Sequence, residues 1–466
     1  MPDPDPKLRL LCKPMESACR PVRRVASALL ALLALVTVAA VLQAGEPAVA
    51  APPTPSGQAT AIGTGGAAAS VDPLATETAI HVLRRGGTAV DAAVAAAAVL
   101  GVVEPFSCGI GGGGFMTIYR ASDGGVFSLD GRETAPQAFR PDSFIDPATG
   151  LPIPFAEGVT SGLGVGVPGT PRLWEEALAR FGRMPLAAAL APAIAIARRG
   201  FEVDQTFHDQ VASNLARFSD FTSTRELYGA TPAVGSIFRN PDLAKTYQKL
   251  AGHGMDAFYG GPLAAAIVQT VQHPPLVREA TRNVRPGLMT AADLAAYEVI
   301  RRAPTEIGYR GHQVFGMGPP SSGGSTVGEA LNILEGFDLA GAQRELALHR
   351  MLEASKLSFA DRNVYLGDPA FFDVPLTGLL SDGYAAVRRA LIGPTALAVP
   401  VAAGDPWPFD AAAFAAVFAD TESPSTTHLT VSDRFGNVVS YTFTIEQIGG
   451  SGIVVPSYGF LLNNEL

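Results

Sequence analysis

The sequence predicts a mixed α+β protein with a layered core, and three stretches of the chain support that prediction. Residues 88–103 have helical character with almost no polar face, so this helix must be buried on nearly all sides. Residues 115–129 and 427–445 each combine short strand-like runs with turn residues between them. A helix that is apolar all round belongs inside a layered fold, where other elements enclose it.

The first two helices are expected to follow one another directly. From residue 71 to residue 85 the apolar positions recur at helical spacing, and the run stops at Gly86-Gly87. Glycine tolerates positive φ and is therefore typical of a helix C-terminus. Thr88 can cap the next helix because its hydroxyl can accept a hydrogen bond from the first turn.

Strand-like runs and helices alternate through the middle of the chain. Residues 115–119 and 125–129 are joined by Ser122-Asp123-Gly124, which predicts a hairpin. Helical spacing then dominates, and strand-like spacing returns once before two further helices and a proline-rich loop. These ranges are 171–200 and 204–272 (helical), 294–318 (strand-like), 325–334 and 346–365 (helices), and 394–408 (loop).

A second strand pair is predicted near the end of the chain. Leu429 and Val431 alternate with polar residues, and residues 433–437 supply a turn. On the returning strand, Val439, Tyr441, Phe443 and Ile445 share one face, and Ser440, Thr442 and Thr444 share the other. Since side chains in a strand alternate in direction, three hydroxyl groups should line up on one face.

The N-terminus predicts export. Six basic residues precede an uncharged run, residues 25–42, and Ala48-Val49-Ala50 offers the small-x-small pattern that signal peptidase accepts. Residues 1–50 are therefore expected to be a signal peptide, and the mature protein is expected to be extracytoplasmic without a stable membrane span. An uncleaved membrane anchor is the alternative, because 18 largely apolar residues lie at the lower limit for spanning a bilayer. Residues 51–70, rich in Pro, Gly, Ser and Ala, are expected to be a flexible linker.

Composition narrows the class of partner. The 466 residues are 47% hydrophobic, which allows a large core, and the formal net charge is −9. No basic stretch follows the first two dozen residues, so we expect a small-molecule substrate and no nucleic acid. The three cysteines, Cys12, Cys19 and Cys108, have neither the spacing nor the neighbouring histidines of a zinc site. No metal and no disulfide framework are expected.

Several common catalytic motifs are absent from the sequence, including G-x-S-x-G, H-E-x-x-H and the P-loop. The glycine-rich run 109–114 lies between a helix and a strand, the reverse of the order that a dinucleotide site requires. Phosphate binding is therefore disfavoured. The run is more typical of backbone that passes close to a neighbouring strand or to a ligand.

The remaining candidate is the Ser425-Thr426-Thr427-His428 cluster. A threonine that becomes the first residue of a chain can act as a nucleophile, because its free α-amine accepts the proton from its own hydroxyl. Taken alone, the cluster fits an ordinary strand start equally well, since threonine favours strands and caps. The surrounding motifs must distinguish a nucleophilic threonine from an ordinary strand start.

Seven ordered motifs, spread over some 380 residues, resemble the signatures of the γ-glutamyltransferases. They are Gly86–Ala95 (GGTAVDAAVA), Gly109–Met116 (GIGGGGFM), Asp130–Pro136 (DGRETAP), Pro319–Gly324 (PPSSGG), Ala360–Arg362 with Asp368-Pro369, Thr426–His428, and Gly459–Glu465 (GFLLNNE). The resemblance implies an N-terminal-nucleophile αββα sandwich, with two central, mostly antiparallel sheets flanked by helices. It also implies self-cleavage into a large subunit, residues 71–425, and a small subunit that starts at residue 426.

The resemblance also assigns roles to single residues. Thr426 matches the nucleophile, Ser425 the residue on the other side of the cut, and Thr444 the threonine that holds the nucleophile. Arg132 matches the arginine that binds the substrate α-carboxylate, a task that suits its planar, bidentate guanidinium. Glu465 matches the position that receives the α-ammonium. The alternatives are a surface ion pair of Arg132 with Glu133 or another neighbour, and an exposed, solvated carboxylate for Glu465.

The implied activity is that of an exported γ-glutamyltransferase or glutathione hydrolase proenzyme. Thr426 would form a γ-glutamyl ester with glutathione or a similar donor and pass the acyl group to water, an amino acid or a peptide. No cofactor is implied.

Two departures from the family pattern keep alternatives open. Glu446 stands where the family usually has an asparagine that contacts the α-amino end of the substrate, so the resemblance implies that Glu446 binds substrate there. The change to a carboxylate raises the alternative of a related acylase with another acyl donor. The family continues beyond the equivalent of Leu466 with an aspartate, a lid loop, and serine and glycine pairs that form the oxyanion hole. On that comparison residues 426–466 are expected to be only the start of the small subunit. An inactive, truncated binding or vestigial protein is then the other alternative.

Overall fold

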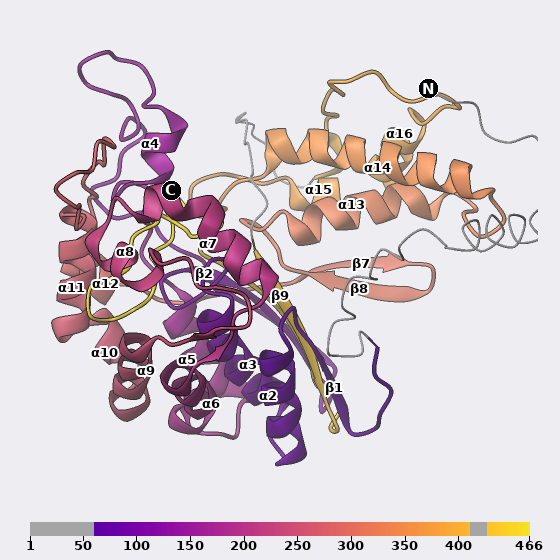
Figure 1. Ribbon diagram of the computed structural model, residues 1–466. Helices are drawn as coiled ribbons and strands as arrows, with labels where there is room; N and C mark the ends of the chain where they lie inside the picture. Colours follow the sequence, from indigo (N-terminus) through magenta and orange to yellow (C-terminus); the bar gives the residue numbers. More distant parts are fainter. Residues whose placement is uncertain (1–59, 411–425) are drawn as a thin grey trace, which may run out of the picture. The chain divides into compact units, whose positions relative to one another are not determined.

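The computed structural model of the chain describes residues 60–410 and 426–466 (Figure 1). The predicted signal peptide, residues 1–50, and Ser425 lie outside the described residues. The helices and strands all belong to one unit, Ile62–Leu466. Within the described part of the chain, no helix is long and apolar enough to cross a membrane.

A six-stranded antiparallel sheet forms the centre of this unit. Both predicted hairpins are confirmed, and they lie side by side because β10 pairs with β2. In sheet order the strands are β1 (Gly66–Ala69), β9 (Thr427–Asp433), β10 (Val438–Thr444), β2 (Gly113–Arg120), β3 (Gly125–Gly131) and β6 (Ile300–Arg302).

The predicted linker 51–70 extends too far along the chain, because residues 66–69 form the edge strand β1. This strand pairs with β9, and Gly66 lies opposite Asp433. A Gly-Ala-Ala-Ala segment has neither β-branched residues nor alternation, so local sequence gives no strand signal there. Pairing with β9 determines its conformation instead.

Helix α3 (Ala89–Val103) packs on β9 and β10, and every one of its residues is buried, as predicted (Figure 1). The Thr88 hydroxyl accepts a hydrogen bond from the Asp91 backbone N–H, and the Asp91 carboxylate accepts one from the Thr88 N–H. This reciprocal capping box satisfies two donors that a helix start leaves free. Three further helices pack beside α3, namely α2 (Pro73–Arg84), α5 (Thr170–Phe181) and α6 (Leu186–Arg199).

The two faces of the sheet differ in polarity. Leu429, Val431, Val439, Tyr441 and Phe443 are buried and belong to the same hydrophobic core as α3. The opposite face of β9 and β10 carries exposed polar side chains, namely His428, Thr430, Ser440 and Thr442. The predicted alternation on this strand pair is therefore confirmed.

Helices make up most of residues 155–295, as the helical spacing predicted. A two-stranded ribbon interrupts them, formed by β4 (Phe201–Glu202) and β5 (Ile237–Phe238). The helices are α4 (Phe155–Val159), α7 (Gln205–Phe218), α8 (Thr222–Tyr228), α9 (Pro241–His253), α10 (Asp256–Tyr259), α11 (Gly261–Gln272) and α12 (Ala291–Ala295).

Residues 305–410 form a further group of elements around a second hairpin. Its strands are β7 (Thr305–Tyr309) and β8 (His312–Gly316), and α13 (Gly323–Glu335) packs on both. The remaining elements are α14 (Arg344–Tyr365), α15 (Leu376–Leu379), α16 (Asp382–Arg389) and the 3₁₀ turn Trp407–Phe409.

The mixed α+β class is confirmed, with an antiparallel sheet flanked by helices. The second central sheet implied by the resemblance is not formed by residues 60–410 and 426–466. In these residues the β7–β8 hairpin remains a two-stranded ribbon, because no described strand pairs with its outer edges.

Candidate active site

One row across the sheet contains three predicted site residues and a glycine between them, namely Thr426, Thr444, Gly113 and Arg132. The β9–β10 register pairs Phe443 with Thr427, so continuing it by one residue sets Thr426 opposite Thr444. Thr444 pairs with Gly113 on β2, and the β2–β3 register, continued past Gly114 and Gly131, sets Arg132 beside Gly113. The row crosses three strand spacings, roughly 14 Å between the Cα atoms of Thr426 and Arg132.

Glycines between these residues allow the strands to approach closely. A Cβ at Gly112 would collide with the carbonyl oxygen of Thr444, and one at Gly114 with the carbonyl oxygen of Thr442. At Gly113 it would collide with the Glu133 carboxyl group. The glycine-rich run is therefore needed for packing against neighbouring chain segments, which resolves the alternative that the sequence left open.

Thr426 itself is exposed and directly precedes β9. The side chain of Thr444 is buried, and its hydroxyl oxygen accepts a hydrogen bond of 2.8 Å from the Glu446 backbone N–H. The half-buried Glu446 has a φ of +75°, an uncommon conformation for a non-glycine residue. The tight bend after β10 thus holds the Glu446 backbone against the Thr444 side chain, next to the row.

Arg132 and Glu465 are in contact, although 333 positions separate them in the sequence. The Arg132 guanidinium forms an ion pair with the Glu465 carboxylate, and a second one of 3.5 Å with Glu133. Glu465 is only 19% exposed, so the alternative of a solvated surface carboxylate is wrong. The two residues assigned to opposite charges of one substrate lie side by side.

Asn463, which the sequence analysis did not single out, holds Glu465 in this position. Its fully buried side chain donates hydrogen bonds to the carbonyl oxygens of Gly111 (2.7 Å) and Gly166 (2.9 Å). Its amide oxygen accepts hydrogen bonds from the backbone N–H groups of Gly166 and Glu465. A polar residue that directly follows the apolar run Phe460–Leu462 was the signal that could have pointed to this role.

Glu133 is the second residue that sequence reasoning missed, because it was considered only as an ion-pair partner of Arg132. Its side chain is fully buried, and neither carboxyl oxygen has a hydrogen-bond partner among the described residues. Burial raises the pKa of Glu133 to about 7, because a low-dielectric environment disfavours the carboxylate. Arg132 opposes this pKa shift, whereas the negative charges of Glu446 and Asp130 reinforce it.

His428 lies on the same face of the sheet as Thr426, two residues further along β9. Its ring nitrogens form hydrogen bonds with the hydroxyl groups of Thr442 (2.7 Å) and Thr430 (3.0 Å). Partial burial lowers the pKa of His428, which favours the neutral ring. In contrast, Thr427 points to the buried side.

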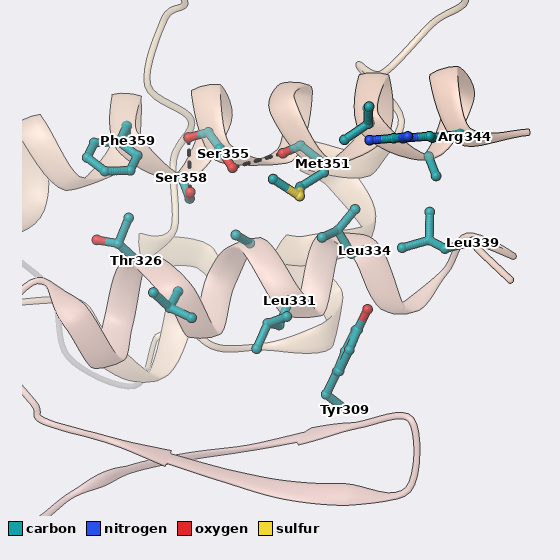
Figure 2. Close-up of a pocket in the computed structure, with 14 residues that line it drawn as sticks. Tyr309, Thr326, Leu331, Leu334, Leu339, Arg344, Met351, Ser355, Ser358 and Phe359 are labelled. Carbon is teal, nitrogen blue, oxygen red and sulfur yellow. Dashed lines mark hydrogen bonds between the residues drawn. The ribbon is translucent and has the colours of Figure 1, made fainter. Parts of the chain in front are cut away.

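A separate pocket of about 490 Å³ lies between α13 and α14 and contains none of the predicted site residues (Figure 2). Leu331 and Leu334 line it from α13, and Met351 and Phe359 line it from α14. Its lining is mostly apolar and includes Arg344 but no carboxylate, histidine or cysteine, so it lacks the usual groups for general acid–base catalysis. In the described part of the chain, no group of three or more His, Cys, Asp or Glu residues could hold a metal ion.

A threonine that directly precedes an inner strand of an antiparallel sheet, opposite a second threonine, is the arrangement expected of the N-terminal-nucleophile hydrolases. Within that class, the chain belongs to the γ-glutamyltranspeptidase family, because the model of that family, described as Gamma-glutamyltranspeptidase, matches residues 75–466. The recognition made from the ordered motifs is thereby confirmed.

Known relatives include both hydrolases of glutathione and acylases. The chain is 40% identical over 416 residues to the glutathione hydrolase proenzyme of Bacillus subtilis (strain 168), covering 87% of this chain and 68% of the relative. It is 36% identical over 415 residues to the acylase ACY 1 proenzyme of Pseudomonas sp. (strain V22), covering 87% of this chain and 70% of the relative. The chain therefore spans about two thirds of the length of these relatives.

Solved structures of an acylase and of a γ-glutamyltranspeptidase also match. Cephalosporin acylase from Bacillus halodurans matches with a TM-score of 0.75 and 30% identity, over 89% of this chain and 72% of the acylase. Helicobacter pylori γ-glutamyltranspeptidase matches with a TM-score of 0.65 and 33% identity, over 73% of this chain and 95% of the matched chain. Family membership alone therefore leaves the acyl donor open.

Proposed function

We propose that the chain is a proenzyme that cleaves itself before Thr426 and then hydrolyses or transfers γ-glutamyl groups. The observation that carries this proposal is the row formed by Thr426, Thr444, Gly113 and Arg132, with Glu465 paired to Arg132. In this proposal Thr426 is the nucleophile at one end of the row, and Arg132 with Glu465 binds the α-amino acid group of the donor at the other end. Residues 71–425 would form the large subunit, and residues from 426 onward would belong to the small subunit.

Self-cleavage would begin with attack of the Thr426 hydroxyl on the carbonyl carbon of Ser425. The Ser425–Thr426 amide bond breaks as the ester forms, and the proton from the hydroxyl goes to the released amine. Water then opens the ester and leaves a new carboxylate at Ser425. Thr426 regains its hydroxyl and gains the α-amine that serves as its own base.

The mature nucleophile would next attack the γ-carbonyl carbon of the donor. The Thr426 α-amine takes the hydroxyl proton and returns it to the leaving amine as the donor amide bond breaks. Water or the amine of an acceptor then attacks the γ-glutamyl ester and restores the threonine. Thr444 supports this step from the adjacent strand, directly opposite the nucleophile in register.

Charge at the far end of the row supports a donor that carries both an α-carboxylate and an α-ammonium. The Arg132 guanidinium matches a carboxylate in a bidentate geometry. Glu465 and Glu133 pair with this guanidinium, and Glu446 lies close enough to Glu133 to raise the pKa of that residue. When a donor carboxylate takes the place of Glu465 on Arg132, the Glu465 carboxylate becomes available to an ammonium group. The zwitterionic end of such a donor would therefore separate Arg132 from Glu465. Its α-carboxylate would pair with Arg132, and its α-ammonium would pair with Glu465.

A related acylase is the second candidate, favoured by the acylases among the relatives. Its donor would carry the carboxylate without the ammonium, for instance a glutaryl amide. Such a donor would take Arg132 from Glu465 and supply no cation in return, which is costly in a partly buried site.

Turnover of two anilides that differ only in the α-amino group separates the candidates. We expect γ-glutamyl-p-nitroanilide to be hydrolysed at least tenfold more efficiently, by kcat/KM, than glutaryl-p-nitroanilide, since one charge-assisted contact contributes about 1.5 kcal/mol or more. Faster turnover of the glutaryl anilide would replace the γ-glutamyl proposal by the acylase.

We also propose that the protein is exported, on the basis of the basic residues and apolar run that precede Ala48-Val49-Ala50. Recovery of the protein outside the cytoplasm with an N-terminus near Ala51 would support export. Retention in the cytoplasm with Met1 intact would contradict it.

A further inference from the structure

The main chain of Arg132 is fixed on both sides by buried side chains that have no assigned role. Its backbone N–H donates a hydrogen bond of 3.0 Å to Asp130 Oδ1. Its carbonyl oxygen accepts a hydrogen bond of 2.7 Å from the Tyr297 hydroxyl. Both side chains are 5% exposed, so water competes poorly for these hydrogen bonds.

Asp130 is itself held by an arginine on the neighbouring strand. Arg302 Nε donates a hydrogen bond of 2.6 Å to Asp130 Oδ2, and Arg302 Nη2 lies 3.5 Å from Asp368 Oδ1. Asp368 is part of the Asp368-Pro369 motif, for which the sequence analysis found no role. A continuous chain of contacts thus runs from the loop after α14, through β6 and β3, to the backbone of Arg132.

Tyr297 is held just as firmly on the other side. Its ring stacks on Tyr259 with a centroid distance of 5.6 Å and an interplanar angle of 10°. The Tyr259 hydroxyl donates a hydrogen bond of 2.8 Å to the Pro168 carbonyl oxygen. Burial raises the pKa of Tyr297 well above its usual value, so the hydroxyl keeps its proton over the whole range of enzyme assays.

We propose that Asp130 and Tyr297 are positioning residues, which hold the Arg132 main chain so that its guanidinium meets the α-carboxylate of the donor in the row with Thr426. The proposal rests on the proposed function. An arginine side chain has several rotatable bonds, and a bidentate contact tolerates little displacement, so a fixed main chain at Arg132 reduces the cost of ordering it. Neither residue reaches the reacting atoms, so both act through Arg132.

The test compares two donors in wild-type protein and in Tyr297→Phe, which removes one hydroxyl and keeps the stacked ring. One donor is γ-glutamyl-p-nitroanilide; the other is 4-aminobutyryl-p-nitroanilide, which lacks the α-carboxylate. We expect Tyr297→Phe to raise KM for the first donor about threefold to tenfold, because the variant loses the free energy of one buried hydrogen bond. The value of kcat should stay within about twofold of the wild type. The second donor has no carboxylate for Arg132 to bind, so its kcat/KM should not change.

Tyr247→Phe is the matched control, because Tyr247 is also fully buried and also donates a hydrogen bond to a backbone carbonyl oxygen, that of Ala98. It should leave both donors unaffected. Asp130→Asn, which keeps the acceptor oxygen but loses the charge that Arg302 pairs with, should again impair only the γ-glutamyl donor. Equal impairment of both donors, or an unchanged KM in Tyr297→Phe, would overturn the positioning role. Failure of the wild type to hydrolyse the γ-glutamyl anilide would instead refute the proposed function.

Discussion

Replacing Glu133 by glutamine removes a buried titrating group beside Arg132 while keeping the shape of the side chain. The wild-type carboxyl group is fully buried, has no hydrogen-bond partner among the described residues, and lies 3.5 Å from the Arg132 guanidinium. Burial outweighs this ion pair, and the pKa of Glu133 rises from 4.5 to about 7.

The sign of the resulting stability change follows from proton uptake. Between pH 4.5 and pH 7 the unfolded chain has lost the Glu133 proton, whereas the folded protein still holds it. Folding therefore binds a proton in this window, and the free energy of unfolding decreases as the pH rises. The pKa shift corresponds to about 3 kcal/mol, on the order of one third of the stability of a typical domain.

Urea unfolding at pH 4.5, 6 and 7.5 measures this effect. We expect the free energy of unfolding of the wild type to fall by about 3 kcal/mol more than that of Glu133→Gln over this range. The same ionisation should matter for binding, because a Glu133 carboxylate competes with the donor α-carboxylate for Arg132. KM for the γ-glutamyl donor should therefore rise above pH 7 in the wild type and stay flat in Glu133→Gln.

Glu104→Gln is the control for this experiment. Burial also raises the pKa of Glu104 to about 7, but the charges that act on it are those of Asp204 and Asp72. This variant should alter the pH dependence of stability and leave that of KM as in the wild type. Parallel stability curves for wild type and Glu133→Gln, together with identical KM profiles, would refute the account of Glu133.

Two further substitutions test the row across the sheet. Arg132→Lys replaces a planar fork by a point charge, and we expect KM for the γ-glutamyl donor to rise at least tenfold with a smaller change in kcat, measured by steady-state kinetics; an unchanged KM would remove Arg132 from the donor site. Gly112→Ala places a Cβ against the Thr444 carbonyl oxygen and should disturb the β2–β10 pairing, so that self-cleavage, followed on a gel, slows or stops. The control is Gly308→Ala, because a Cβ at Gly308 has no atom within 4 Å, and this variant should cleave normally. Normal cleavage of both variants would contradict the close approach of Gly112 to the Thr444 carbonyl oxygen.

Local patterns in the sequence predicted the elements that local interactions stabilise. Thr88 and Asp91 form the cap that begins α3, and the absence of polar residues in residues 89–103 predicted its burial. Both hairpins have their turn residues between their strands, so their pairing needs no distant information. The β10–β2 pairing joins segments more than 300 residues apart and has no such local signal.

The prediction of the candidate site depended more strongly on the resemblance to the γ-glutamyltransferases than the prediction of the fold did. Nothing in the local sequence brings Arg132 to Glu465, and the family motifs alone placed both at the donor. Glu133 could not be identified as a buried acid, because the polar run Arg132-Glu133-Thr134 looks solvent-exposed until the neighbouring strand and Gly113 are in place. The same holds for Tyr297, whose hydroxyl reaches Arg132 only through the tertiary fold.

The identity of the N-terminus that self-cleavage creates tests the central claim most directly. Mass spectrometry and N-terminal sequencing of the purified protein should reveal a chain that begins at Thr426, and a γ-glutamyl donor should label that residue as an ester. Thr426→Ala should stay uncut and inactive, whereas Thr430→Ala, on the same strand, should cleave. An uncut wild-type chain with full γ-glutamyl transfer activity, or an active Thr426→Ala variant, would contradict the account.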